Sequence, residues 1–165
     1  MFGVNRSDAA AAGYTAYVLA FWSIGLPVVV LVGERGSAVP VWRPWPFAVL
    51  AGIALASGAA LVMAGGRRLA HAGVGLFGTQ PGPVLVASGP YRYLRNPMDA
   101  GTVLVAAAPA LALGLRQTWL VPVAAIVYLA VGFEPLEERR LLEAFGDEYS
   151  DYRRSVPRWF PRDAE

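Results

Sequence analysis

Four long apolar runs restrict this chain to helices that cross a membrane. They cover residues 14–32, 46–64, 97–115 and 118–134. A helix of 19 residues, the length of the first three runs, extends about 28 Å, close to the roughly 30 Å of a bilayer's hydrocarbon core. The sequence therefore predicts an all-α integral membrane bundle of about four transmembrane helices, built as a single domain over residues 1–165. A soluble bundle of very apolar helices is the alternative.

Composition supports the membrane interpretation and excludes several kinds of site. Hydrophobic residues make up 56% of the chain and charged residues only 16%, which is too apolar for an ordinary soluble domain. The sequence has no cysteine, so disulfides, thiolate catalysis and cysteine-ligated metal are ruled out. Its single histidine, His71, argues against a histidine-rich zinc site or a Ser-His triad. We therefore expect no metal.

The arginines predict the orientation of the chain. Four spans would place the N-terminus, the interval 65–96 and the C-terminal segment on one side of the membrane. Eleven of the fourteen basic residues, all of them arginine, lie on that side and three on the other. The positive-inside rule then puts both termini in the cytoplasm. Because the arginines flank apolar runs, anionic headgroups explain them better than nucleic acid does.

The third apolar run begins with a charged turn that has two interpretations. Asn96 suits an N-cap, Pro97 suits the first helical position, and Asp99 suits the positive end of the helix dipole. These residues can thus be no more than a well-built helix start. The other interpretation is functional, since a helix N-terminus beside Arg92 and Arg95 is able to bind an anion. Both remain open on the sequence.

A second charged segment follows the fourth apolar run. Pro135 can start a helix there and Gly146 can end it. Glu137 and Glu138 fall in its first turns, where pairing with Arg140 on a solvated face is the usual explanation. Acids at the boundary of a membrane span are costly, however, and this cost suggests a cationic partner.

The tail mixes aromatic and basic side chains. Tyr149, Tyr152 and Trp159 lie among Arg153 and Arg158. Such a mixture is typical of a segment that lies along the lipid headgroups. We predict that position for the tail.

Taken together, these motifs resemble a family of integral membrane enzymes, the isoprenylcysteine carboxyl methyltransferases. The resemblance covers residues 85–161 and is to the bacterial branch and the wider group that includes phospholipid methyltransferases. The chain departs from the pattern at Asp99, where the family usually has Tyr. The matching positions are Gly89, Pro90, Tyr91, Arg92, Arg95, Asn96, Pro97, Glu137, Glu138, Leu141, Phe145, Gly146, Tyr149, Tyr152, Val156 and Pro157.

The resemblance implies that S-adenosylmethionine is the methyl donor, held at the cytosolic face between segments 85–99 and 135–161. Acids would neutralise its sulfonium and ammonium groups, and an arginine or a helix N-terminus would bind its carboxylate. It assigns catalysis to Arg95 and Asn96. It assigns cofactor binding to Gly89, Pro90, Tyr91, Arg92, Arg95, Asn96, Pro97, Glu137, Glu138 and Leu141. Candidates for an adenine slot are Tyr91, Tyr93 and Leu141.

The implied function is methyl transfer to a lipophilic substrate at the cytosolic face of a bacterial inner membrane. Carboxyl O-methylation is the first choice, because a carboxylate is already ionised at neutral pH and its methylation needs alignment more than a strong base. N-methylation of a phospholipid or another lipid amine is the alternative among enzymes. A non-catalytic binding or scaffold protein with the same fold is the alternative of another class. The expected partners are a lipid-linked or lipophilic small molecule and membrane lipids.

Overall fold

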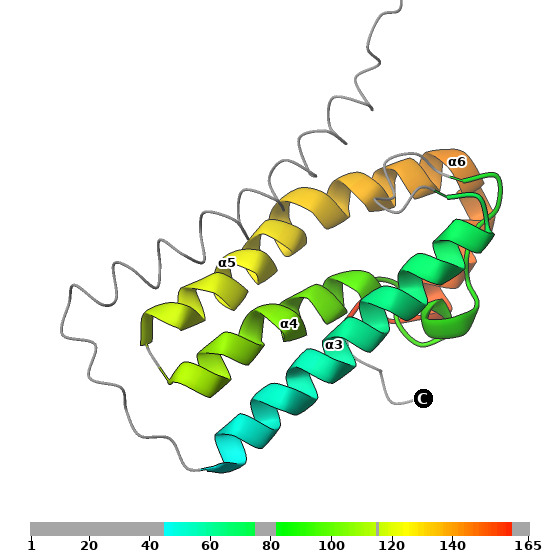
Figure 1. The fold of residues 1–165 in the computed structure, drawn as a ribbon. Helices are drawn as coiled ribbons and strands as arrows, with labels where there is room; N and C mark the ends of the chain where they lie inside the picture. The colour runs from blue at the N-terminus through cyan, green and yellow to red at the C-terminus, as the bar shows by residue number, and fades with distance from the viewer. Residues whose placement is uncertain (1–44, 75–81, 115, 160–165) are drawn as a thin grey trace, which may run out of the picture.

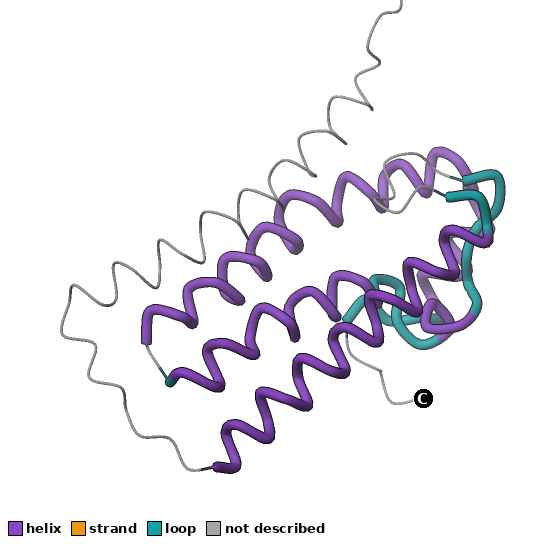
Figure 2. The backbone as a smooth tube through the Cα atoms, viewed as in Figure 1, coloured by secondary structure: helices purple, strands orange, loops and turns teal. Residues whose placement is uncertain are grey.

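The computed structural model describes residues 45–74, 82–114 and 116–159. Within these ranges the regular structure is entirely helical, with no strand (Figure 2). The elements are α3 (Trp45–His71), the 3-10 turn η2 (Gly89–Arg92), α4 (Pro97–Leu113), the 3-10 turn η3 (Arg116–Trp119), α5 (Leu120–Tyr128), the π-turn η4 (Leu129–Phe133) and α6 (Glu134–Ser155).

Two of the described helices are long and apolar enough to cross a membrane. They are Trp45–His71 and the continuous helix Leu120–Ser155, and Pro97–Leu113 is a shorter apolar helix. Large apolar side chains on their outer faces are exposed, such as Ile53 at 58% and Val131 at 76%, as a lipid-facing surface requires. The predicted helical class is therefore confirmed. The prediction of four spans is not, because the first span, 14–32, lies outside the described residues.

Helix α3 is longer than predicted. The sequence placed the end of its apolar run at residue 64 and a polar interval from residue 65, but the helix continues to His71. Gly65 and Gly66 are buried there, and a Cβ on Gly65 would lie 2.7 Å from Cγ of Met98. Tight packing against the start of α4 thus offsets the weak helix propensity of the two glycines. As a result, the basic last turn of α3 reaches the turn that precedes α4.

Small residues join α3 to α4. Their contact is the largest between any two described elements, and Gly58 and Gly101 meet at its centre. Gly58 is thus used for close packing. Gly52, earlier on the same helix, has no described atom within 4 Å of a built Cβ. Close approach of this kind stabilises the packing of two apolar helices through van der Waals contact.

Helix α4 returns as α5 through a short connection. Gly114 caps α4 with a left-handed backbone, φ 69°, and α4 and α5 then pack side by side. The two helices form an antiparallel hairpin, which places the end of α5 and the start of α6 at the same end of the molecule as the start of α4 (Figure 1).

The helix α5–α6 is continuous but changes pitch where it leaves the apolar run. Pro135 lacks an N–H, and its ring would clash with the carbonyl of Val131. The turn before it widens to a π-turn, in which the N–H of Glu134 bonds to the carbonyl oxygen of Leu129. Pro135 was expected to start a helix. It lies instead within a helix that has already begun, and it widens the turn before it.

Gly146 redirects α6 but does not end it. Its backbone angles, φ 51° and ψ −119°, are non-helical, and helical geometry resumes until Ser155. The predicted stop is therefore confirmed as a break between two helical stretches, and the second stretch follows directly because a glycine can adopt this conformation and let the chain bend and continue. The bend brings the residues that follow Gly146 back over the turn that precedes α4.

The tail lies on the protein and does not match the predicted headgroup segment. Tyr149 is 2% exposed and Val156 9% exposed. The hydroxyl of Tyr152 donates a 2.6 Å hydrogen bond to the carbonyl oxygen of Tyr91. These side chains are covered by the turn before α4, a long-range contact that the local pattern of aromatic and basic residues does not encode.

Candidate functional site

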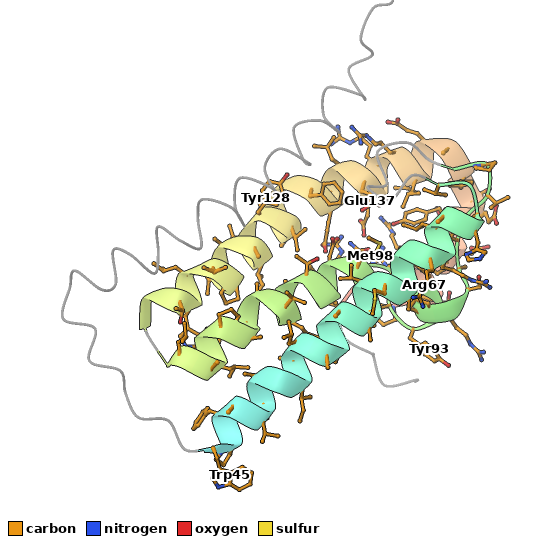
Figure 3. The ribbon with its side chains drawn as sticks, in the orientation of Figure 1. Trp45, Arg67, Tyr93, Met98, Tyr128 and Glu137 are labelled. Carbon is orange, nitrogen blue, oxygen red and sulfur yellow. The ribbon has the colours of Figure 1, made fainter. Side chains whose placement is uncertain are left out.

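The site is built where the end of α3, the turn before α4 and the first turns of α6 meet. Figure 3 shows Met98 and Glu137 near one another at this end, with Trp45 at the opposite end of α3. The predicted start of α4 is confirmed, with Asn96 at the N-cap and Pro97 at the first helical position. Among the described atoms, however, the Asn96 side chain makes no capping bond, and its amide lies 3.4 Å from Asp99 Oδ2, to which it donates.

An ion pair joins the turn before α4 to the start of α6. Arg95 Nη1 lies 2.6 Å from Glu138 Oε1, and the two side chains are only 11% and 15% exposed. Tyr149 places its hydroxyl 3.4 Å from the same nitrogen of Arg95. Largely buried, hydrogen-bonded pairs of this kind are specific in geometry, and removing one partner leaves an uncompensated charge. The turn before α4 and the start of α6 are thus fixed relative to each other.

A pocket opens beside this pair. Its volume is about 770 Å³ when the open mouth and the solvent in it are included. One wall is polar and the other is aliphatic and aromatic. The residues that line it are Leu69, Val74, Gly82, Val84, Leu85, Val86, Tyr91, Arg95, Asn96, Glu137, Glu138, Arg140, Leu141, Phe145, Tyr149 and Tyr152.

The two glutamates of the second motif differ in their surroundings. Glu138 is held by Arg95 and by Arg158, whose Nη2 lies 2.7 Å away. Glu137 is partly buried, and burial raises its pKa to about 7, with the charge of Glu134 adding to the rise. The charge of Arg140 opposes that rise. Glu137 is therefore the acid whose charge a ligand in the pocket would feel most.

Two polar groups in this region are buried without a hydrogen-bond partner among the described residues. They are Nε of Arg95 and Oε1 of Glu134. A buried donor without a partner costs free energy, so in native proteins it usually awaits a ligand or water. Arg95 lines the pocket, and its side chain is 11% exposed, but Nε itself is closed to solvent, so a ligand can approach only the other atoms of this side chain.

The structure brings some of the predicted site residues into the pocket and leaves others outside. Those that line it are Tyr91, Arg95, Asn96, Glu137, Glu138 and Leu141. Those that are not among its lining residues are Gly89, Pro90, Arg92, Pro97 and Tyr93. Arg92 and Tyr93 are exposed and stack on each other, with 5.8 Å between guanidinium carbon and ring centroid. Pro97 is fully buried and serves the start of α4.

Gly89 supports the turn. Its φ of 65° is left-handed, and a Cβ there would lie 3.6 Å from the Arg68 side chain. Arg68 Nε in turn donates a 3.0 Å hydrogen bond to Ser88 Oγ. These contacts attach the turn to the end of α3, which makes Gly89 a residue of support and not of the pocket wall.

Several lining residues were not assigned to the site from the sequence. Phe145, Tyr149 and Tyr152 were recognised only as motif positions, although the spacing of Phe145 from Leu141 places these two on one helical face; Tyr149 and Tyr152 lie beyond the bend at Gly146. That spacing was a usable signal. The sequence carried no such signal for Leu69 and residues 84–86. Only the extra turns of α3 and the path of the loop bring them to the pocket.

Among the described residues no group of histidine, cysteine, aspartate and glutamate side chains could hold a metal ion. The polar wall of the pocket is formed by two arginines, two glutamates, an asparagine and three tyrosines. Its chemistry is that of charge pairing and hydrogen bonding to an organic ligand.

Comparison with known families decides the kind of protein. A family model described as phospholipid methyltransferase matches residues 47–148, which is more than half of the chain. The chain belongs to the phospholipid methyltransferase family. Isoprenylcysteine carboxyl methyltransferase-like proteins are members of the same family, so the resemblance found in the sequence is confirmed. No curated protein and no solved structure matches the chain.

Membership gives the site a general chemistry. The family consists of methyltransferases that generally use S-adenosylmethionine and act on lipid-type substrates. Its match to this chain includes α3, α4, α5 and the start of α6, and so most of the pocket wall. Together with the apolar helices, it indicates a membrane protein.

Proposed function

We propose that this protein transfers a methyl group from S-adenosylmethionine to a lipophilic substrate at the cytosolic face of a bacterial inner membrane. The observation that carries the proposal is that Arg95 and Glu137 line the same pocket. The cofactor has one carboxylate and two cationic groups, so it needs a donor and an acid close together.

The residues present fit this cofactor. Arg95 can donate to a carboxylate in a charge-assisted bond, and the ionised form of Glu137 can balance a cation. Leu141, Phe145 and Val86 supply part of the apolar wall, which suits an adenine ring better than Tyr93 does, since Tyr93 is 65% exposed. Burial raises the pKa of Tyr91, so its hydroxyl stays protonated and able to donate.

Bound S-adenosylmethionine supplies an electrophilic methyl group. The chain's own contribution is to orient the acceptor and to exclude water, because in-line transfer depends on alignment of the reacting atoms. Carboxyl O-methylation is our first candidate: a carboxylate acceptor needs no proton removed, and Arg95 and Arg140 are both in the pocket wall. Asn96 would orient the acceptor from the polar wall.

N-methylation of a lipid amine is the second candidate, and it is favoured by the acids. Asp99 is buried at 8% exposure, and its charge interacts with those of Glu137 and Glu134. An ammonium group entering such a site must lose a proton before it can accept a methyl group, and Glu137, whose pKa is about 7, is able to take it.

Two measurements test the proposal. Calorimetric titration of the purified protein with S-adenosylhomocysteine should show binding at one site, which a scaffold protein need not show. Incubation with methyl-labelled S-adenosylmethionine and a set of carboxylate and amine lipids should then label one class. Absence of both binding and labelling would leave a non-catalytic membrane protein of the same fold.

A further inference from the structure

Residues 156–159, here called the strap, cross the ion pair that joins the two motifs. The main-chain N–H of Arg95 donates a 2.9 Å hydrogen bond to the carbonyl oxygen of Pro157. Val156, 9% exposed, anchors the start of the strap. The strap lies beyond residue 148, where the match to the family model ends; Val156 and Pro157 are positions of the family pattern, but Arg158 is not.

One side chain of the strap joins two acids. Arg158 places Nη2 at 2.7 Å and Nε at 3.2 Å from Oε1 of Glu138. Its Nη1 lies 3.4 Å from Oε2 of Glu134. Trp159 adds a 3.1 Å hydrogen bond from its indole nitrogen to that same oxygen. The planar, forked guanidinium can bridge two carboxylates in this way, which a lysine ammonium could not reproduce.

The contacts of Arg158 affect the position of Arg95 because both arginines bind Oε1 of Glu138. The Arg95 contact is 2.6 Å and the Arg158 contact 2.7 Å, while Arg153 is more distant at 3.9 Å from the other oxygen. A carboxylate held from two sides has one orientation. Arg95 then binds Glu138 through Nη1, and this contact holds its side chain in the pocket wall.

The bridge also neutralises a charge that the fold has buried. Glu134 is 0% exposed and stands where the apolar run ends, and its ion pair in the described part of the chain is with Arg158. A buried carboxylate needs such a partner. Without Arg158, Glu134 would draw on the nearest remaining cations, and these hold Glu138.

We propose that Arg158 is a positioning residue of the methyltransferase site: it fixes the Glu138 carboxylate, which in turn holds the Arg95 side chain in the pocket wall, where it can bind the carboxylate of a ligand. This inference rests on the proposed function. It predicts that the strap acts on the pocket through Glu138 and not through general stability.

The test is a double-mutant cycle read by calorimetric titration with S-adenosylhomocysteine. Arg158→Gln should weaken binding about ten- to a hundredfold, the range for one lost charged hydrogen bond. In the Glu138→Gln background the same substitution should have little further effect, since coupled residues are non-additive. Arg154→Gln is the matched control, because Arg154 is 76% exposed and pairs with the exposed Asp151. It should bind as the wild type does.

A second series of variants separates a loss of affinity from a loss of folding. Arg158→Gln leaves Glu134 buried and unpaired, so we also compare Glu134→Gln with Glu134→Gln/Arg158→Gln, in which that buried charge is gone. The double variant should show the same loss of affinity relative to Glu134→Gln alone. If the wild type binds but these Arg158 variants bind equally well, or if the losses add fully in the Glu138→Gln background, the positioning role is overturned and the proposed function stands. If the wild type itself does not bind, the proposed function fails and this inference with it.

Discussion

Gly58 of α3 and Gly101 of α4 face each other so closely that a Cβ atom on either would lie 2.6 Å from the carbonyl oxygen of the other. No real Cβ approaches a backbone oxygen to that distance. The two glycines therefore set the separation of α3 and α4, and with it the position of the turn that carries Arg95. Packing in the apolar half of the molecule thus determines geometry in the polar half.

Gly58→Ala should destabilise the protein. The new methyl group meets backbone, which cannot rotate away, so the helices must separate at a cost of about 1–3 kcal/mol. Gly52→Ala is the control on the same helix, because no described atom lies within 4 Å of its built Cβ. It should be neutral or stabilising by up to about 1 kcal/mol through helix propensity. Thermal unfolding in detergent measures both, and equal midpoints would contradict the close packing.

Ligand binding should depend on pH through Glu137. Its pKa of about 7 lies above the ordinary value of 4.5, so the acid is protonated below 7 and negatively charged above it. Binding of a cationic ligand should then strengthen as pH rises from 6 to 8, by up to about tenfold over that range, because the ionised fraction of the acid rises by that factor. The same raised pKa means that this residue's contribution to folding stability falls as pH rises from about 4.5 through 7.

Titrations of S-adenosylmethionine, whose sulfonium is a fixed positive charge, at pH 6, 7 and 8 check this expectation. Glu137→Gln should bind more weakly at pH 8 and lose the part of the pH dependence that comes from the protein. The ligand's own ionisation is common to both proteins and cancels in the comparison. A pH profile identical in wild type and Glu137→Gln would remove Glu137 from the binding site.

Asp99 should serve the start of α4 more than the choice of acceptor. It is buried and accepts the Asn96 hydrogen bond, and it is not among the residues that line the pocket. Asp99→Asn should therefore keep cofactor binding and cost about 0.3–1 kcal/mol of stability through the helix dipole.

The functional control for Asp99 is the acceptor profile. We would assay wild type, Asp99→Asn and Asp99→Tyr against one carboxylate lipid and one amine lipid. Equal preference in all three supports the structural role. A switch from amine to carboxylate in the variants would show that the charge of Asp99 selects a cationic acceptor.

Both termini should lie in the cytoplasm. Eleven arginines fall on the side that would hold the termini and both motifs, and three fall on the other. Reporter fusions after Glu165 and within residues 36–41 should locate to opposite sides of the membrane. Two fusions on the same side would contradict the four-span topology.

The sequence by itself determined the helical class, the apolar runs, the start of α4 and the identity of the two motifs. These depend on local information: the length of an apolar run, the fixed φ of Pro97, and charges that flank the membrane. The resemblance added the pairing of Arg95 and Asn96 with Glu137 and Glu138 in one site, since shared motifs carry over contacts that no periodicity shows.

Only the tertiary structure decided how the site closes. Gly146 could be a helix stop or a bend, and the choice depends on whether Tyr149 and Tyr152 find partners when the chain turns back. They do, at Arg95 and Tyr91. The different surroundings of Glu137 and Glu138 arise in the same way, because Arg158 is 20 residues from Glu138 in sequence and reaches it only after the bend. Pairwise contacts made at such a distance along the chain are set by the path of the backbone, which local sequence patterns do not specify.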